Sequence, residues 1–87
     1  MKIELGRVVA TPGVLKQVPG TEIYASITRH SLGDWGIVCE EDRRQNDWAA
    51  QNGERVLSAY RSASGVKFWV ITEWDRSCTT VLLPEEY

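Results

Sequence analysis

Cysteine is scarce in this chain of 87 residues, which holds only Cys39 and Cys78. A secreted chain of this size is usually denser in cysteine, because disulfides supplement a core that is too small. The start of the chain, MKIELGRVVATPG, lacks the apolar segment of a signal peptide, and no run approaches the roughly 18 apolar residues of a membrane span. We therefore expect a cytoplasmic protein with two reduced thiols and no membrane contact. The sequence leaves open whether Cys39 and Cys78 are paired.

Histidine is rarer still, and His30 is the only one in the chain. One histidine and two distant cysteines form none of the close pairs that bind zinc. The acidic residues Asp34, Glu40 and Glu41 do not match a calcium loop, and no glycine-rich loop is present to hold a phosphate. The sequence therefore predicts no metal and no cofactor.

An excess of positive charge is also missing. The formal net charge is -2, whereas a nucleic-acid-binding domain usually carries a clear basic excess, so nucleic acid is not the expected partner. Hydrophobic residues make up 43% of the chain and four residues are tryptophan. This composition is typical of one small globular domain over residues 1–87.

The first half of the chain predicts one strand and three helices. The segment KIELGRVVAT favours a strand with a bulge at Gly6. Thr11 is suited to cap a short helix before the Pro19-Gly20 stop, and Thr21 to cap a second helix that ends at Gly33. A third helix over residues 40–52 has an acidic first turn and ends at Gly53.

The last third changes to β-branched and aromatic runs, RVLSAYRS, VKFWVITEW and CTTVLLP, separated by turn-like residues. We expect an α+β fold in which these runs form a three-stranded antiparallel meander, with the N-terminal strand as a candidate fourth member. Both faces of the middle strand are apolar, so helices would cover one face and a partner the other, which suggests a homodimer through a sheet face. The expected core is Leu5, Val9, Leu15, Ile23, Ile27, Trp48, Leu57, Phe68, Val70, Val81 and Leu83.

Three segments contain candidate binding residues. Trp35, held between Gly33 and Gly36, is interpreted first as a plug of the core and second as an anchor for a partner. The run EEDRR offers Arg43 and Arg44 to an anion, although pairing with Glu40 at helical spacing is the favoured interpretation. In TEWDRSCTT, an exposed aromatic among charges is typical of a binding hot spot, and turn capping fits equally well. The candidate residues of that last segment are Trp74, Asp75 and Arg76.

The segments GRVVATPG, RHSLGDWG, LSAY and FWVITEWDRSCTTVLLPEEY resemble a family of small uncharacterised prokaryotic proteins that are often carried on plasmids and integrative elements. Some members are labelled as a subunit of type I restriction enzymes. The resemblance covers nearly the whole chain and implies a mobile-element setting without a catalytic assignment. This chain is too short for a methyl-donor domain and lacks an N-P-P-[FY] motif, so methyltransferase activity is rejected.

The leading hypothesis is a non-enzymatic accessory protein that binds another protein. The alternative is a small hydrolase or nuclease that uses His30 and Asp34, with Arg29 or Arg44 stabilising an anion. No G-x-S-x-G frame surrounds a serine, and a structural role for His30 at the end of an apolar helix face is favoured. A third hypothesis is nucleic-acid binding by an aromatic sheet face with Tyr60, Trp69 and Trp74, against which the acidic balance argues.

Overall fold

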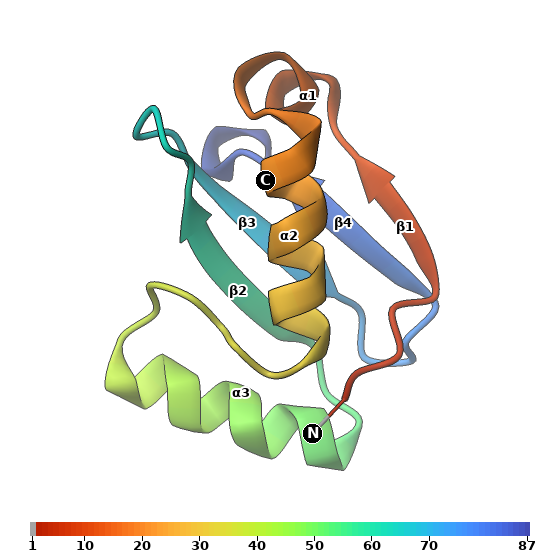
Figure 1. Ribbon diagram of the computed structural model, residues 1–87. Coiled ribbons are helices and arrows are strands. Elements are labelled where there is room, and N and C mark those ends of the chain that lie inside the picture. The colour runs from red at the N-terminus through yellow and green to blue at the C-terminus, as the bar shows by residue number, and fades with distance from the viewer. Residues whose placement is uncertain (1) are drawn as a thin grey trace.

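A computed structural model describes residues 2–87 as a four-stranded sheet with α-helices packed against it (Figure 1). In chain order the elements are β1 (Arg7–Ala10), α1 (Pro12–Gln17), α2 (Gly20–Ser31), α3 (Glu40–Asn52), β2 (Val56–Arg61), β3 (Lys67–Thr72), β4 (Cys78–Leu82) and the short 3₁₀ helix η1 (Pro84–Glu86). The α+β class and the N-terminal strand are confirmed. Among residues 2–87, no helix has the length and apolar character needed to cross a membrane.

The strands lie in the order β1-β4-β3-β2. Strands β2, β3 and β4 form the predicted antiparallel meander, and β1 adds to β4 in parallel. The parallel pairing follows from the connection, because three helices separate β1 from the meander and allow the chain to return in the same direction. The strands that lie inside the sheet are therefore β4 and β3.

The helix boundaries largely follow the sequence signals. Helix α3 spans the predicted residues and ends at Gly53, whose backbone is left-handed. The Thr11 side chain accepts a hydrogen bond from the Val14 backbone at the start of α1, as predicted. The predicted cap at Thr21 is wrong, because α2 begins at Gly20 and its N-cap, Pro19, lies two residues before Thr21 and has no side-chain capping hydrogen bond. The predicted first strand is too long, because β1 begins only after Gly6.

Helices α1 and α2 bury one face of the sheet, which we call the helix face. Figure 1 shows α2 crossing in front of the strands and α3 lying along one end of the sheet, beside β2. The core under α1 and α2 consists of Val14, Val18, Ile23, Tyr60, Phe68, Val70, Val81 and Leu83. A second cluster joins Ala49 of α3 to Val56 of β2, together with Ile3 and Trp35.

Three predicted core residues are exposed: Val9, Leu15 and Trp48. On α1 the buried position is Val14, so the next residue, Leu15, points away from the sheet. On α3 the buried positions are Asn46 and Ala49, which leaves Trp48 on the solvent side. Five predicted core residues, Ile23, Phe68, Val70, Val81 and Leu83, are buried, and Leu5, Ile27 and Leu57 are half-buried.

Candidate functional site

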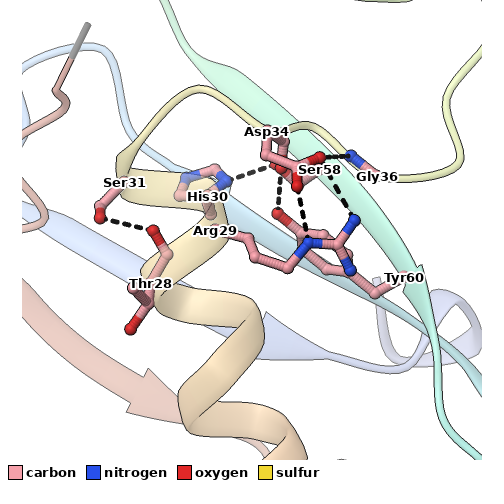
Figure 2. Close-up of polar contacts among 8 residues, drawn as sticks. All are labelled: Thr28, Arg29, His30, Ser31, Asp34, Gly36, Ser58 and Tyr60. Carbon is pink, nitrogen blue, oxygen red and sulfur yellow. Dashed lines mark hydrogen bonds and ion pairs between the residues drawn. The ribbon is translucent and has the colours of Figure 1, made fainter.

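His30 lies inside the protein, fully buried near the end of α2. Its Nδ1 is 2.6 Å from Ser58 Oγ on β2 (Figure 2), and its Nε2 is 2.8 Å from Thr72 Oγ1 on β3. Thr72 Oγ1 lies 2.7 Å from Thr79 Oγ1 on β4, which donates to the carbonyl oxygen of Leu5 at 2.7 Å. One chain of hydrogen bonds therefore joins α2, three strands and the segment before β1.

The direction of this chain is fixed by its last acceptor. A carbonyl oxygen only accepts, so the single hydroxyl proton of Thr79 is used on Leu5, and Thr72 must donate to Thr79. The hydroxyl of Thr72 then accepts from His30 Nε2–H, and the unprotonated Nδ1 accepts from Ser58. In the neutral form of His30, the proton therefore lies on Nε2.

This environment suits a structural histidine. Burial lowers the pKa of His30 to about 4, because the imidazolium would lose its hydration, and the positive charge of Arg76 acts in the same direction. Both ring nitrogens bond to hydroxyl groups of the strands. A general base needs a free nitrogen that a substrate can reach, and neither nitrogen is free here.

The Asp34 carboxylate forms an ion pair with Arg29. Arg29 donates from Nε to Asp34 Oδ2 at 2.7 Å and from Nη2 to Oδ1 at 3.2 Å, as a fork (Figure 2). This hydrogen bonding from Arg29 lowers the pKa of the Asp34 carboxyl. The same loop is held to β2 by the Tyr60 hydroxyl, which donates to the Asp34 carbonyl at 2.5 Å. The structure therefore pairs Asp34 with Arg29 and not with His30.

Gly36 brings the loop against the edge of β2. It forms a parallel bridge with Ala59, and a Cβ atom at this position would lie 2.0 Å from the Ala59 carbonyl oxygen. Its φ of 78° also belongs to the left-handed region that favours glycine. The backbone of Trp35 and Ile37 thus pairs with Ala59, and Asn46 of α3 makes two hydrogen bonds to the backbone of Leu57.

Trp35 is buried to 2% exposure and closes one end of the core, as the favoured interpretation predicted. Its ring meets His30 edge-on at 5.6 Å between centroids, and its Nε1–H donates to Asp47 at 2.9 Å. A ring enclosed in this way is not offered to a partner. The placement corrects the assignment of Trp35 as a binding residue.

The candidate arginines of α3 are exposed and locally paired. Arg43 and Arg44 both donate to the Glu40 carboxylate, at helical spacing. Hydrogen bonding to Arg43 lowers the pKa of Glu40. This is the ion-paired helix surface that the favoured interpretation describes.

The turn between β3 and β4 contains the other three candidates. Asp75 accepts from the backbone and hydroxyl of Ser77, which makes it a turn cap. Arg76 donates to the carbonyl oxygens of Ala49 and Glu54, at the C-terminal end of α3, and so ties the turn to that helix. Trp74 remains, with 63% of its surface exposed.

The second face of the sheet, which we call the open face, lies opposite α1 and α2. By the strand registers its side chains are Arg7, Val9, Leu57, Ala59, Arg61, Lys67, Trp69, Ile71, Cys78, Thr80 and Leu82. Ala59, Ile71 and Leu82 are buried, and the other residues are half-buried or exposed. Three of these residues are cationic and none of these strand positions is acidic, although the chain as a whole has a net charge of -2. Tyr60 lies on the helix face, so it shares no surface with Trp69.

An aromatic pair crosses the open face. Tyr87, which follows η1, meets the half-buried Trp69 edge-on with ring centroids 5.8 Å apart. Arg55 stacks over the Tyr87 ring at 5.1 Å and donates to its hydroxyl at 2.5 Å. The Tyr87 side chain remains exposed, with 69% of the residue's surface accessible. The aromatic surface therefore reaches solvent without a helix above it.

Two cations face each other beside this pair. Arg61 and Lys67 are direct partners in the register of β2 and β3, and both are exposed. Within residues 2–87 neither forms an ion pair. Like charges directly opposite each other destabilise a sheet, so the fold itself gains nothing from this pair.

The pocket and the cysteines of this protein give less support for a functional site than the open face does. A pocket of about 210 Å³ lies between α3 and β2, lined by Val38, Asp42, Gln45, Asn46 and Leu57. It is smaller than the roughly 300–1,000 Å³ of sites that enclose a small molecule. Both cysteines are free thiols, and in the described part of the chain no group of acidic, histidine and cysteine side chains is arranged to hold a metal ion.

Sequence reasoning missed the cation pair and Tyr87. The signal for the pair was the near-symmetric spacing of Arg61 and Lys67 around the turn SASGV. Tyr87 carried no signal, because its contact with Trp69 depends on the path of the chain after β4.

No family model, curated protein or solved structure matches this chain.

Proposed function

We propose that this protein is a protein-binding module whose contact surface is the open face. The observation that supports it most directly is the Arg61–Lys67 pair beside the Trp69–Tyr87 pair. The pair of like charges lowers the stability of the sheet, and the aromatic pair beside it reaches solvent. A surface with both features is typical of a binding site rather than of a structural one.

An enzymatic function has less support. His30 is enclosed, with both nitrogens hydrogen-bonded inside the sheet, and the Asp34 carboxylate is held by Arg29. A hydrolase or nuclease built on these two residues would need both side chains at one accessible place.

The partner we propose is a different protein. Two copies packed symmetrically through the open face would bring cationic surfaces together, which disfavours the homodimer that the sequence suggested. The resemblance to small proteins of plasmids and integrative elements adds a setting, in which the element or its host encodes the partner.

Capture from a native-host lysate treated with nuclease tests the proposal. Tagged wild-type protein is compared with Trp69→Ala and Trp74→Ala, which remove one aromatic ring each at different places of the fold. Circular dichroism and thermal unfolding establish that both variants are folded. Trp35→Ala is unsuited to this comparison, because it would remove a buried ring of the core.

We expect a stoichiometric protein partner that the wild-type and Trp74→Ala proteins retain and the Trp69→Ala protein loses. Retention by Trp69→Ala with loss by Trp74→Ala would move the contact surface to the turn between β3 and β4. Equal recovery with all three proteins would overturn the proposal.

A further inference from the structure

We propose that the open face receives an amphipathic helix of the partner, with acidic side chains of that helix against Arg61 and Lys67 and its apolar side chains across Trp69. This inference rests on the proposed function and adds the chemistry of the partner to it.

The acidic side chains follow from charge complementarity. Arg61 and Lys67 lie opposite each other, and none of the strand positions of the open face supplies a carboxylate. Glu73 directly follows β3, and its backbone N–H donates to the Cys78 carbonyl, while Glu85 and Glu86 belong to η1. Glu86 is bonded to Thr11, Gly13 and Leu83. A carboxylate placed between Arg61 and Lys67 by a partner would relieve their repulsion and gain two charged hydrogen bonds.

The apolar side chains follow from the rest of the face. Beyond the two cations, the part of the face that solvent reaches continues with half-buried Trp69 and Thr80 and with exposed Val9, and the Tyr87 ring stands above Trp69. Ile71 and Leu82 share this face but are already buried within the chain, so Trp69 and Tyr87 are the apolar surface that a partner can contact. A sheet with one layer of helices and a second apolar face is completed most simply by a further helix, as in three-layer α/β architectures. Pairing with an extended segment needs a free strand edge, which is not what this face offers.

The length of the face sets the length of the helix. Strand β3 has 6 residues, and at about 3.3 Å per residue it spans roughly 20 Å. A helix rises about 1.5 Å per residue, so roughly 13 residues, or almost four turns, cover the strand. Acidic residues would occupy the turn over Arg61 and Lys67, and an i, i+3, i+4 apolar stripe would occupy the remaining turns.

A second copy of this chain does not provide such a helix. Helix α3 has the right length and an acidic first turn, but its inward positions Asn46 and Ala49 are already used by its own strand β2 and core. Its solvent side has one large apolar side chain, Trp48, where a docking helix needs an apolar stripe. The helix must therefore come from another protein.

Defined probes test the inference. Three fluorescein-labelled ligands are used: a 14-residue helical peptide with a leucine stripe and three glutamates at one end, the same peptide with those glutamates replaced by glutamine, and the oligonucleotide dT12. Fluorescence anisotropy at low and high NaCl gives the affinities of the full chain and of three variants. The variants are Lys67→Glu, Trp69→Ala and, as a matched charge reversal on exposed α1, Lys16→Glu.

We expect the glutamate peptide to bind at least tenfold more tightly than the glutamine peptide and to weaken with salt. Lys67→Glu should weaken its binding tenfold or more, and Lys16→Glu should leave it unchanged. Equal affinity for the two peptides, no detectable binding of either, or an unchanged affinity in Lys67→Glu would overturn the acidic helix. Tighter binding of dT12 that is lost in Lys67→Glu would assign the cations to nucleic-acid phosphates instead.

The two proposals fail separately. If the peptides do not bind while lysate capture still depends on Trp69, the open face remains a protein-binding surface and only the acidic helix is wrong. If capture is also independent of Trp69, the proposed function itself is wrong.

Discussion

The hydrogen-bond chain through His30 predicts that acid destabilises the protein before its carboxylates titrate. In the unfolded chain the pKa of histidine is about 6.5, and burial lowers the pKa of His30 to about 4 in the folded protein. Between these two values only the unfolded state binds the proton, so the free energy of unfolding falls as the pH falls from about 6.5 to about 4. Above this window both states are neutral, and below it both are protonated.

The magnitude follows from the width of the window. Two and a half pH units at about 1.4 kcal/mol each give roughly 3 kcal/mol. A domain of this size has a free energy of unfolding of about 4–13 kcal/mol, so the loss is a large fraction of it. Protonation would also place a second N–H on the imidazole and force Ser58 to give up its role as donor.

Urea unfolding between pH 4.5 and 8, followed by tryptophan fluorescence, measures the effect. His30→Gln provides the reference curve, because the acidic groups whose pKa values are lowered, among them Asp34 and Glu40, are common to both proteins. The contribution of those acidic groups to the free energy of unfolding is lost in both proteins as the pH falls through their lowered pKa values. The difference between the wild-type and His30→Gln curves therefore isolates the contribution of His30. A difference that stays flat from pH 6.5 to 4.5 would refute the reasoning.

The tautomer gives a test that needs no variant. Nitrogen chemical shifts should identify His30 as neutral with its proton on Nε2 at pH 7, since the Leu5 carbonyl fixes the direction of every bond in the chain. A proton on Nδ1 would show that the chain runs in the other direction, and an imidazole pKa near 6.5 would remove the predicted acid sensitivity.

Three further predictions concern stability, and urea unfolding checks each of them. Gly36→Ala should lower the free energy of unfolding by about 3 kcal/mol or more, because it combines a left-handed backbone with a Cβ atom too close to Ala59; an unchanged midpoint would contradict this contact. Arg76→Met should cost about 1–3 kcal/mol, because carbonyl groups at the end of α3 lose their charged donor, and a neutral effect would mean that water replaces the guanidinium. Lys67→Glu should stabilise the fold by about 0.2–1 kcal/mol by turning a like-charge pair with Arg61 into an opposite-charge pair, so destabilisation would argue against the assigned register.

Much of the fold could be read from the sequence, because its signals are local. The acidic first turn and the glycine at the end of α3 gave both of its boundaries, and the β-branched runs gave the meander. The error at Trp48 arose because a polar residue occupies the inward side of α3. Asn46 is buried because its amide satisfies the backbone of Leu57 at the sheet edge, which rotates Trp48 toward solvent. Periodicity of apolar residues cannot detect this exchange.

The residues of the open face depend on which side of the sheet the helices cover and on the register of β2 and β3. The apolar residues on both sides of β3 indicated an interior strand, but they did not indicate which side α1 and α2 would take. The register of β2 and β3 then decides what the other side presents. The backbone N–H of Ser62 donates to the carbonyl of Val66, and this closed turn places Arg61 directly opposite Lys67. A shift of one residue in this pairing would have placed Arg61 and Lys67 on opposite faces of the sheet.

The same register explains why a chain with a net charge of -2 can present a cationic surface. Its carboxylates are concentrated on α3, where Glu40 is neutralised by Arg43 and Arg44, and in loops and turns such as the one capped by Asp75. The strands of the open face contain none. Net charge therefore argued correctly against a strong overall field, but it says nothing of how charge is divided between two faces of one sheet. Binding that depends on Lys67 and is independent of Lys16, two residues of equal charge on different surfaces, would show that this division is what a partner recognises.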